Sequence, residues 1–174
     1  MRFVDLLRAT VLLSLASASM LAVVAVVKAN VDQDPRLVFI AMAWWLVAGA
    51  IGAWLGRRLQ PTDAVATALR EAKTTSTLPE MRQGRVLLNR LWPLLAATVV
   101  AAALALAWPQ IAAIAAGFCV IWSLSWRHQE AAVAAIEERD GVTFYVASTA
   151  VVGPVKLVRT PGLRREVPTG AVNP

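Results

Sequence analysis

Four long blocks without any charged residue constrain this chain more than any other feature of its sequence. The blocks cover residues 9–27, 37–56, 91–107 and 110–126. A helix in a water-soluble protein needs a polar face, and these blocks have none. Each is close to the roughly 20 apolar residues that cross a hydrocarbon layer about 30 Å thick. The sequence therefore predicts an all-α membrane protein with four transmembrane helices. The predicted spans cover residues 9–28, 37–56, 90–107 and 110–126.

The composition points the same way. Apolar residues make up 58% of the chain and charged residues 16%, against roughly 45–50% and about 25% in an ordinary globular protein. The single cysteine, Cys119, falls inside the fourth block, so an intramolecular disulfide is excluded.

The amino terminus also has some features of a secretory signal. Arg2 and Arg8 precede an apolar run, and the small residues Ser17, Ala18 and Ser19 resemble a cleavage site. The apolar run continues for another eight or so residues, up to position 27. We therefore expect an uncleaved first span.

The distribution of Arg and Lys predicts the orientation. The loop over residues 57–89 is basic, whereas the connection between the first two spans carries only Lys28 and Arg36. The basic residues of the loop and its end are Arg57, Arg58, Arg70, Lys73, Arg82, Arg85 and Arg90. Because short loops rich in Arg and Lys stay in the cytoplasm, we expect this loop there. An even number of spans then places both termini in the cytoplasm of a multi-pass protein of the cell membrane.

The expected partner of this basic surface is the anionic cytoplasmic leaflet. The net charge is +6, and each basic residue near such a leaflet contributes about 1 kcal/mol of attraction. No basic helix with interleaved aromatic residues and no recognised binding module is present, so we do not expect nucleic acid as a partner.

Tryptophan and arginine residues mark the predicted membrane interfaces. The expected interface anchors are Trp54, Trp92, Trp108, Trp126, Arg57, Arg58, Arg90 and Arg127. Trp44 and Trp45 lie deeper in the second span, where we expect contact with lipid or with a neighbouring helix.

Small residues recur at helical spacing in the spans, and close approach of such residues drives helix association in lipid. The predicted packing residues are Ala48, Gly52, Gly56, Ala97, Ala101, Ala105, Ala113 and Gly117. The first span offers a similar stripe at Ser14, Ala18 and Ala22. We expect these faces to pack within one chain, with a homodimer interface as the alternative. Short outer turns predict two antiparallel helical hairpins.

The sequence divides at residue 126 into a transmembrane domain, 1–126, and a cytoplasmic region, 127–174. Pro61, with Thr62 or Asp63 as a cap, opens a short amphipathic helix that we expect on the membrane surface. In the cytoplasmic region we expect the fourth helix to extend over 127–139. A β-hairpin over 142–159 and a flexible tail are predicted to follow.

No residue pattern predicts catalysis, a cofactor or a metal site. His128 is the only histidine, and one His with one buried Cys cannot supply the roughly four ligands of a zinc site. Glu137, Glu138 and Asp140 form the densest acidic cluster, but they lack the spacing of a calcium loop. The spans contain no carboxylate that could relay protons.

These observations favour a non-enzymatic interaction, accessory or scaffold protein, acting with a partner membrane protein or as a homo-oligomer. The alternative is an oligomeric permeation or transport component without proton coupling. A membrane enzyme that uses the acidic cluster near Glu137 is the third and weakest hypothesis.

Overall fold

The computed structural model describes residues 1–57, 62–74, 83–148 and 155–161. Within these residues, four helices are long and apolar enough to cross a membrane. They are built from α1 (Phe3–Val31), α2 (Pro35–Leu55), α4 (Gln83–Leu104) and α5 (Pro109–Trp126). The predicted helical class with four long apolar helices is confirmed, and a small sheet accompanies the helices.

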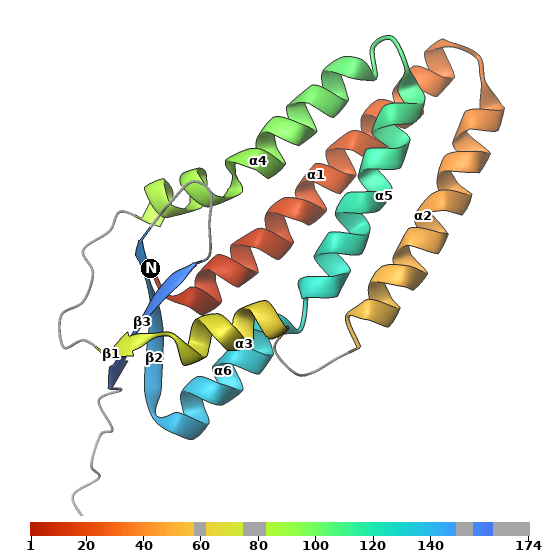
Figure 1. The fold of residues 1–174 in the computed structure, drawn as a ribbon. Coiled ribbons are helices and arrows are strands. Elements are labelled where there is room, and N and C mark those ends of the chain that lie inside the picture. The colour runs from red at the N-terminus through yellow and green to blue at the C-terminus, as the bar shows by residue number, and fades with distance from the viewer. Residues whose placement is uncertain (58–61, 75–82, 149–154, 162–174) are drawn as a thin grey trace, which may run out of the picture.

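The boundaries of the helices follow from local sequence signals. Pro35 and Pro109 occupy the first turns of α2 and α5, where a missing amide costs nothing. At the start of α2, Asp34 Oδ1 accepts a hydrogen bond of 3.1 Å from the amide of Arg36. Helix α4, which corresponds to the third predicted span, begins at Gln83, seven residues before that span, and contains Pro93. Figure 1 shows α4 bending in its first half, as an internal proline predicts.

Helix α5 occupies the centre of the bundle. It packs against α1 on one side and against α2 on the other, while α4 lies along the far side of α1 (Figure 1). Helix α2 therefore rests mainly on α5 and only weakly on its sequence neighbour α1.

The remaining elements form a small unit at one end of the bundle, which we call the terminal module. It comprises α3 (Asp63–Arg70), β1 (Lys73–Thr74), α6 (Gln129–Asp140), β2 (Val142–Ser148), β3 (Lys156–Pro161) and the first two residues. Figure 1 shows the amino terminus beside β2 and β3. Segments from the start, middle and end of the chain thus meet at the same end of the bundle.

The predicted β-hairpin strands pair as expected, within a larger sheet. Strands β2 and β3 are antiparallel, with Phe144 opposite Arg159 and Val146 opposite Leu157. The predicted turn of the hairpin lies outside the described residues. Strand β3 continues to Pro161, into the tail that was predicted from Thr160, and the tail from residue 162 lies outside the described residues. Sequence reasoning missed β1, which pairs in parallel with β3, and the bridge from Arg2 to Tyr145.

The predicted extension of the fourth helix over 127–139 is helical over most of its length, as α6, but a turn separates it from the fourth span. Helix α5 ends at Trp126, a turn follows at Arg127 and His128, and α6 runs in another direction (Figure 1). The physical reason is burial, because the turn brings Val133 of α6 into the core of the terminal module. Helix α6 ends at Asp140, and Gly141 after it adopts the left-handed conformation at φ 63°.

Two apolar clusters hold the described chain together. The first, inside the terminal module, joins it to the beginnings of α1 and α4. It contains Phe3, Leu6, Leu7, Val65, Val86, Val133, Phe144, Val146 and Leu157. The second lies among the long helices and is rich in alanine. Val65 shows that the apolar face of α3 packs on the chain itself, where the sequence predicted contact with the membrane surface.

Candidate functional site

The predicted packing residues lie mostly in helix contacts. Ala48, Gly52 and Gly56 of α2 are buried, and the last two face Ile121 and Leu124 of α5. Ala101, Ala105, Ala113 and Gly117 are also buried. Ala97 is exposed instead, and Thr98 is the buried residue beside it. The contact face of α4 therefore passes through positions 91, 98, 101 and 105.

Trp44 and Trp45 bind the backbone of α5. The indole Nε1 of Trp44 donates to the carbonyl of Ile114 at 3.2 Å, and that of Trp45 donates to Ala113 at 2.9 Å. A side chain at Gly117 would collide with the Trp44 indole, so this glycine leaves room for it. The sequence indicated interhelical packing as one role for these tryptophans but gave no sign of the hydrogen bonds.

Hydroxyl groups in the long helices donate hydrogen bonds to backbone carbonyls. Ser14, Thr98 and Ser125 each donate to the carbonyl four residues earlier. Ser123 of α5 donates to Val11 of α1 at 3.3 Å and so joins two helices. Among the described residues, no buried side-chain nitrogen or oxygen lacks a hydrogen-bond partner.

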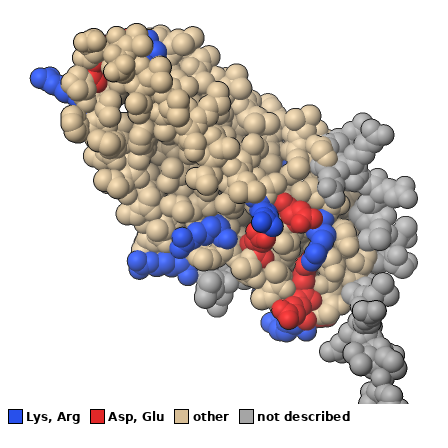
Figure 2. Space-filling model, turned by 180° about the vertical axis from the view of Figure 1, so that it is seen from behind, with Lys and Arg blue, Asp and Glu red and all other residues tan. Residues whose placement is uncertain are grey.

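Most of the predicted interface anchors lie at or beside the ends of the helices, whereas Arg90 and Trp92 lie inside the first half of α4. Trp54, Trp92 and Trp108 are exposed, and Trp126 is half-buried and stacks on Trp122 at 5.7 Å between ring centres. Arg57 and Arg127 are exposed, Arg90 is partly buried, and Arg58 lies outside the described residues. Figure 2 shows charged residues gathered toward the two ends of the visible face, with a broad uncharged belt between them.

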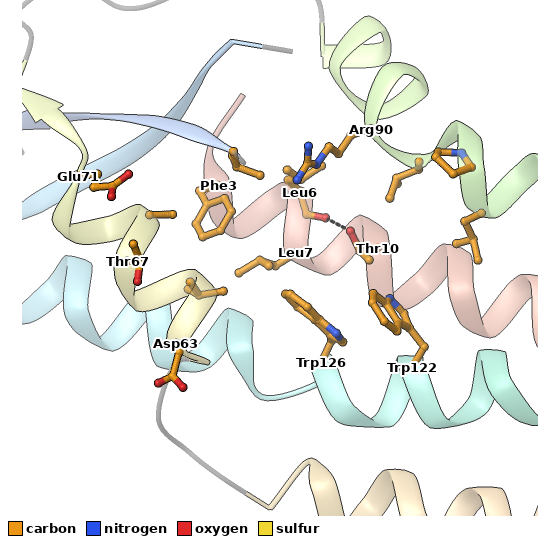
Figure 3. A pocket seen from close by; sticks show the side chains of 16 residues that line it. Phe3, Leu6, Leu7, Thr10, Asp63, Thr67, Glu71, Arg90, Trp122 and Trp126 are labelled. Carbon is orange, nitrogen blue, oxygen red and sulfur yellow. Dashed lines mark hydrogen bonds between the residues drawn. The ribbon is translucent and has the colours of Figure 1, made fainter. Parts of the chain in front are cut away.

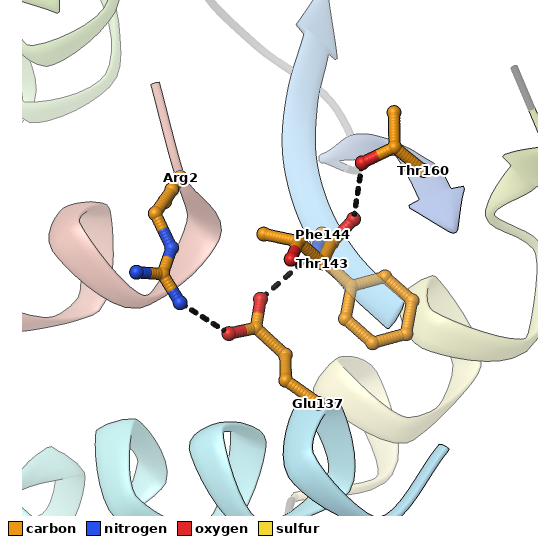
Figure 4. Close-up of polar contacts among 5 residues, drawn as sticks. All are labelled: Arg2, Glu137, Thr143, Phe144 and Thr160. Carbon is orange, nitrogen blue, oxygen red and sulfur yellow. Dashed lines mark hydrogen bonds and ion pairs between the residues drawn. The ribbon is translucent and has the colours of Figure 1, made fainter. Parts of the chain in front are cut away.

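Glu137 is a buried carboxylate of the terminal module that contacts two other segments of the chain (Figure 4). Its side chain is 7% exposed and accepts one hydrogen bond from Arg2 and one from the Phe144 amide, both at 2.8 Å. The contact raises the pKa of Arg2, first through the hydrogen bond and then through the carboxylate charge. Glu137 therefore joins the amino terminus, α6 and β2, and both of its oxygens serve that structural contact.

The other residues of the acidic cluster are exposed at the end of α6. Glu138 is exposed, and Asp140 pairs with its neighbour Arg139, which lowers the pKa of Asp140. His128 accepts a hydrogen bond from Arg127 at 2.9 Å. Across the described ranges, no three His, Cys, Asp or Glu side chains come close enough to hold a metal ion.

A second buried polar contact anchors α3. Gln129, which is 2% exposed, accepts a hydrogen bond of 3.0 Å from the amide of Thr62 at the start of α3. Thr62 occupies the predicted capping position, but its own side chain makes no capping hydrogen bond. A glutamine from α6, distant in sequence, therefore accepts a hydrogen bond from the backbone amide of the predicted cap residue itself.

A cavity of about 780 Å³ lies where the terminal module meets the long helices (Figure 3). Its walls come from the first turns of α1, from α3, from α4 around Pro93 and from the end of α5. The apolar lining includes Phe3, Leu6, Leu7, Val65, Leu91, Pro93, Leu94, Trp122, Trp126 and Val155. The polar and charged lining consists of Thr10, Asp63, Thr67, Glu71 and Arg90.

This cavity was not predicted. Arg90 and Trp126 stand in the sequence as separate interface anchors, and only the fold brings them to the same cavity. The bend at Pro93 was the available signal, because a kink at the end of a span opens space beside it.

Comparisons with protein-family models, curated proteins and solved structures find no match for this chain.

Proposed function

We propose that this chain is a multi-pass protein of the cell membrane, with its terminal module in the cytoplasm, that acts as an interaction or accessory subunit. The exposed surface of the long helices supports insertion. Phe39, Ile40 and Leu46 are each at least 68% exposed, and soluble monomers rarely expose large contiguous apolar patches. In a bilayer these side chains contact lipid.

The basic residues of the terminal module support the proposed orientation. Lys73, Lys156 and Arg159 are exposed on β1 and β3. At the other end of the bundle, Lys28 pairs with Asp32 at 3.3 Å. Because Arg and Lys are retained in the cytoplasm, the module faces the cytoplasm and the turn between α1 and α2 faces outside.

The orientation predicts opposite labelling of two introduced cysteines in a Cys119→Ser background. A membrane-impermeant maleimide is expected to label Gln33→Cys in intact cells, because the turn residue Gln33 is exposed. It should label Glu138→Cys only after the membrane is permeabilised. Labelling of Glu138→Cys in intact cells would contradict the orientation.

The observation that carries the interaction role is the position of the charged surface. The polar groups buried inside the bundle serve the chain's own backbone, whereas Lys73, Lys156 and Arg159 remain exposed on a folded sheet. A folded basic surface held at the ends of membrane helices suits an acidic region of a partner membrane protein.

A partner test compares charge reversal at the two ends of the bundle. Purification in mild detergent followed by mass spectrometry should recover a stoichiometric membrane protein with the wild-type chain and with Arg36→Glu. Lys156→Glu should lose most of it, by tenfold or more. A homo-oligomer that leaks small solutes from liposomes, with no other protein attached, would instead favour the permeation role. A monomer without a partner would also contradict the proposal.

A further inference from the structure

The cavity where the terminal module meets the long helices has the size of a ligand site and a mostly apolar lining. Its volume of about 780 Å³ lies within the range of about 300–1,000 Å³ typical of small-molecule pockets. Phe3, Leu6 and Leu7 line it from α1 and are buried. The stacked rings of Trp122 and Trp126 line it from α5. Apolar cavities exclude water and bind apolar molecules.

The polar groups of the lining are engaged within the chain or exposed to solvent. The Thr10 hydroxyl donates to the carbonyl of Leu6 at 2.8 Å (Figure 3), and Arg90 already has an interaction. The polar residues that α3 and its end contribute, Asp63, Thr67 and Glu71, are all exposed. A ligand inside the cavity therefore binds through hydrophobic contacts.

The cavity extends from the apolar part of the bundle into the terminal module. At one end, Pro93 and Trp122 belong to the predicted spans and are exposed. At the other end, the lining includes the buried Val65 of α3. Figure 3 shows the labelled α3 residues on one side of Leu7 and Trp122 on the other. The lining on α1 runs from residue 3 to residue 10, which is about 10 Å at 1.5 Å per residue.

We propose that this cavity takes one acyl chain of a membrane phospholipid, whose end leaves the bilayer and enters the apolar interior of the terminal module. The inference rests on the proposed insertion, which places Pro93 and Trp122 in contact with lipid. The cavity holds about 10 Å of chain, roughly two-thirds of the 15 Å that one leaflet contributes to a hydrocarbon layer. The headgroup stays at the membrane surface beside the bundle, so its chemistry does not decide binding.

The two ends of the cavity favour a phospholipid over a free fatty acid. The end at Pro93 and Trp122 is apolar, so a chain enters there from the bilayer. At the other end, Asp63 and Glu71 are exposed carboxylates, and the carboxylate of a fatty acid beside them would be repelled. The chain of a phospholipid ends in a methyl group and brings no charge to these residues.

Photocrosslinking of the full chain in liposomes tests this assignment. The liposomes contain a small fraction of phosphatidylcholine with a diazirine near the end of one acyl chain. Ordinary bilayer lipids hold that position near the midplane, whereas a chain in the cavity brings it to Phe3, Leu6 and Leu7. Trypsin cleavage after Arg2 and Arg8 releases these three residues in one peptide, 3–8. Mass spectrometry should find adducts on them.

Two substitutions fill the cavity from different walls. Thr10→Phe on α1 and Ala68→Phe on α3 each add an aromatic ring to the lining. Each should lower the adducts on peptide 3–8 about tenfold, which corresponds to about 1.4 kcal/mol of binding free energy. Two walls keep the test decisive if one variant does not fold. Val23→Phe is the matched control, because Val23 lies on α1 outside the lining and is 61% exposed; its adducts should equal those of the wild-type chain.

The lipid itself is varied in two further arms. Phosphatidylglycerol with the same photoreactive chain should label peptide 3–8 as strongly as phosphatidylcholine does. The free fatty acid with that chain should label it less. Stronger labelling by the fatty acid, a clear preference for one headgroup, or undiminished labelling in both filled variants would overturn the assignment.

The proposed insertion and the chain site can fail separately, because one sample reports both. Lipids around the bundle should label Leu46 and Val47, which are 76% and 51% exposed in the middle of α2. Adducts there without adducts on peptide 3–8 would overturn the chain site and leave the insertion standing. Failure to label either region would overturn the insertion as well.

Discussion

Gly56→Ala is expected to destabilise the helix bundle by about 1–3 kcal/mol, as overpacking of a closely packed site does. An added Cβ at Gly56 would collide with the carbonyl oxygen of Leu124 and lie 3.1 Å from the Leu124 carbonyl carbon. Backbone atoms cannot rotate aside, so α2 and α5 must separate at this point. The φ of Gly56 is −76°, which alanine adopts freely, so the effect isolates the contact from backbone strain.

Gly49→Ala is the matched control for this prediction. Gly49 lies on the same helix with nothing within 4 Å of an added Cβ, and alanine is better than glycine in a helix by up to about 1 kcal/mol. Gly56→Ala should therefore lower the free energy of unfolding, whereas Gly49→Ala should raise it. Each purified variant is unfolded in mixed micelles with increasing dodecyl sulfate, and circular dichroism follows the loss of helix. The two unfolding curves give the change in stability for each substitution. Equal effects at the two positions would contradict the observed α2–α5 contact.

The close contact at Gly117 extends the same interface. A Cβ there would meet the Trp44 indole, with its Cε2 atom at 2.6 Å, and that ring is held by its hydrogen bond to Ile114. Unlike the Leu124 carbonyl, a tryptophan ring can rotate away from an added methyl group. The contact between α2 and α5 thus has two parts. Gly56 lies directly against the backbone of Leu124, and the Trp44 indole fits beside Gly117.

A structural feature was predictable from the sequence where its signal lies within a short stretch of the chain. The four long helices were predictable because a run of about 20 apolar residues is a local property. The turn at Gly141 and the strands over 142–148 and 156–161 also have local signals. The neighbour of each helix was not predictable in this way, because the small-residue stripe of α2 gives no indication that it meets α5.

The residues that assemble the terminal module were the least predictable. In the sequence alone, nothing distinguishes Arg2 from other basic residues near a terminus or Gln129 from other helix residues. Glu137 is one of three residues in an acidic cluster. Their partners lie on elements far away in the sequence, except that Phe144 is close to Glu137. Strand β1 has two residues and pairs with β3 across more than 80 positions, which leaves no local pattern to detect. The cavity is unpredictable for the same reason, because its lining comes from five separate segments.

Glu137→Ala is expected to destabilise the terminal module by about 1–4 kcal/mol while leaving the long helices intact. The substitution removes the acceptor of the buried Phe144 amide, and an unsatisfied buried donor costs about 1–3 kcal/mol. It also removes the ion pair with Arg2, which is 51% exposed, so that pair contributes at most about 1 kcal/mol. Glu137→Gln keeps a carbonyl acceptor for the Phe144 amide. It removes only the charge that pairs with Arg2, so it should lower the stability of the module by only about 1 kcal/mol.

Hydrogen exchange distinguishes this local effect from general unfolding. In Glu137→Ala, the amides of β2 and the first residues of the chain should exchange faster, since Glu137 joins Phe144 to Arg2 and the Val146 amide donates to the Met1 carbonyl at 3.1 Å. The exchange rates of the amides of α2, which is not part of the module, should be unchanged. Glu138→Ala, one residue away and exposed, should alter stability by no more than about 0.5 kcal/mol. If both substitutions had the same small effect, Glu137 would not be the residue that holds the amino terminus to α6, and the module would depend on its apolar core alone.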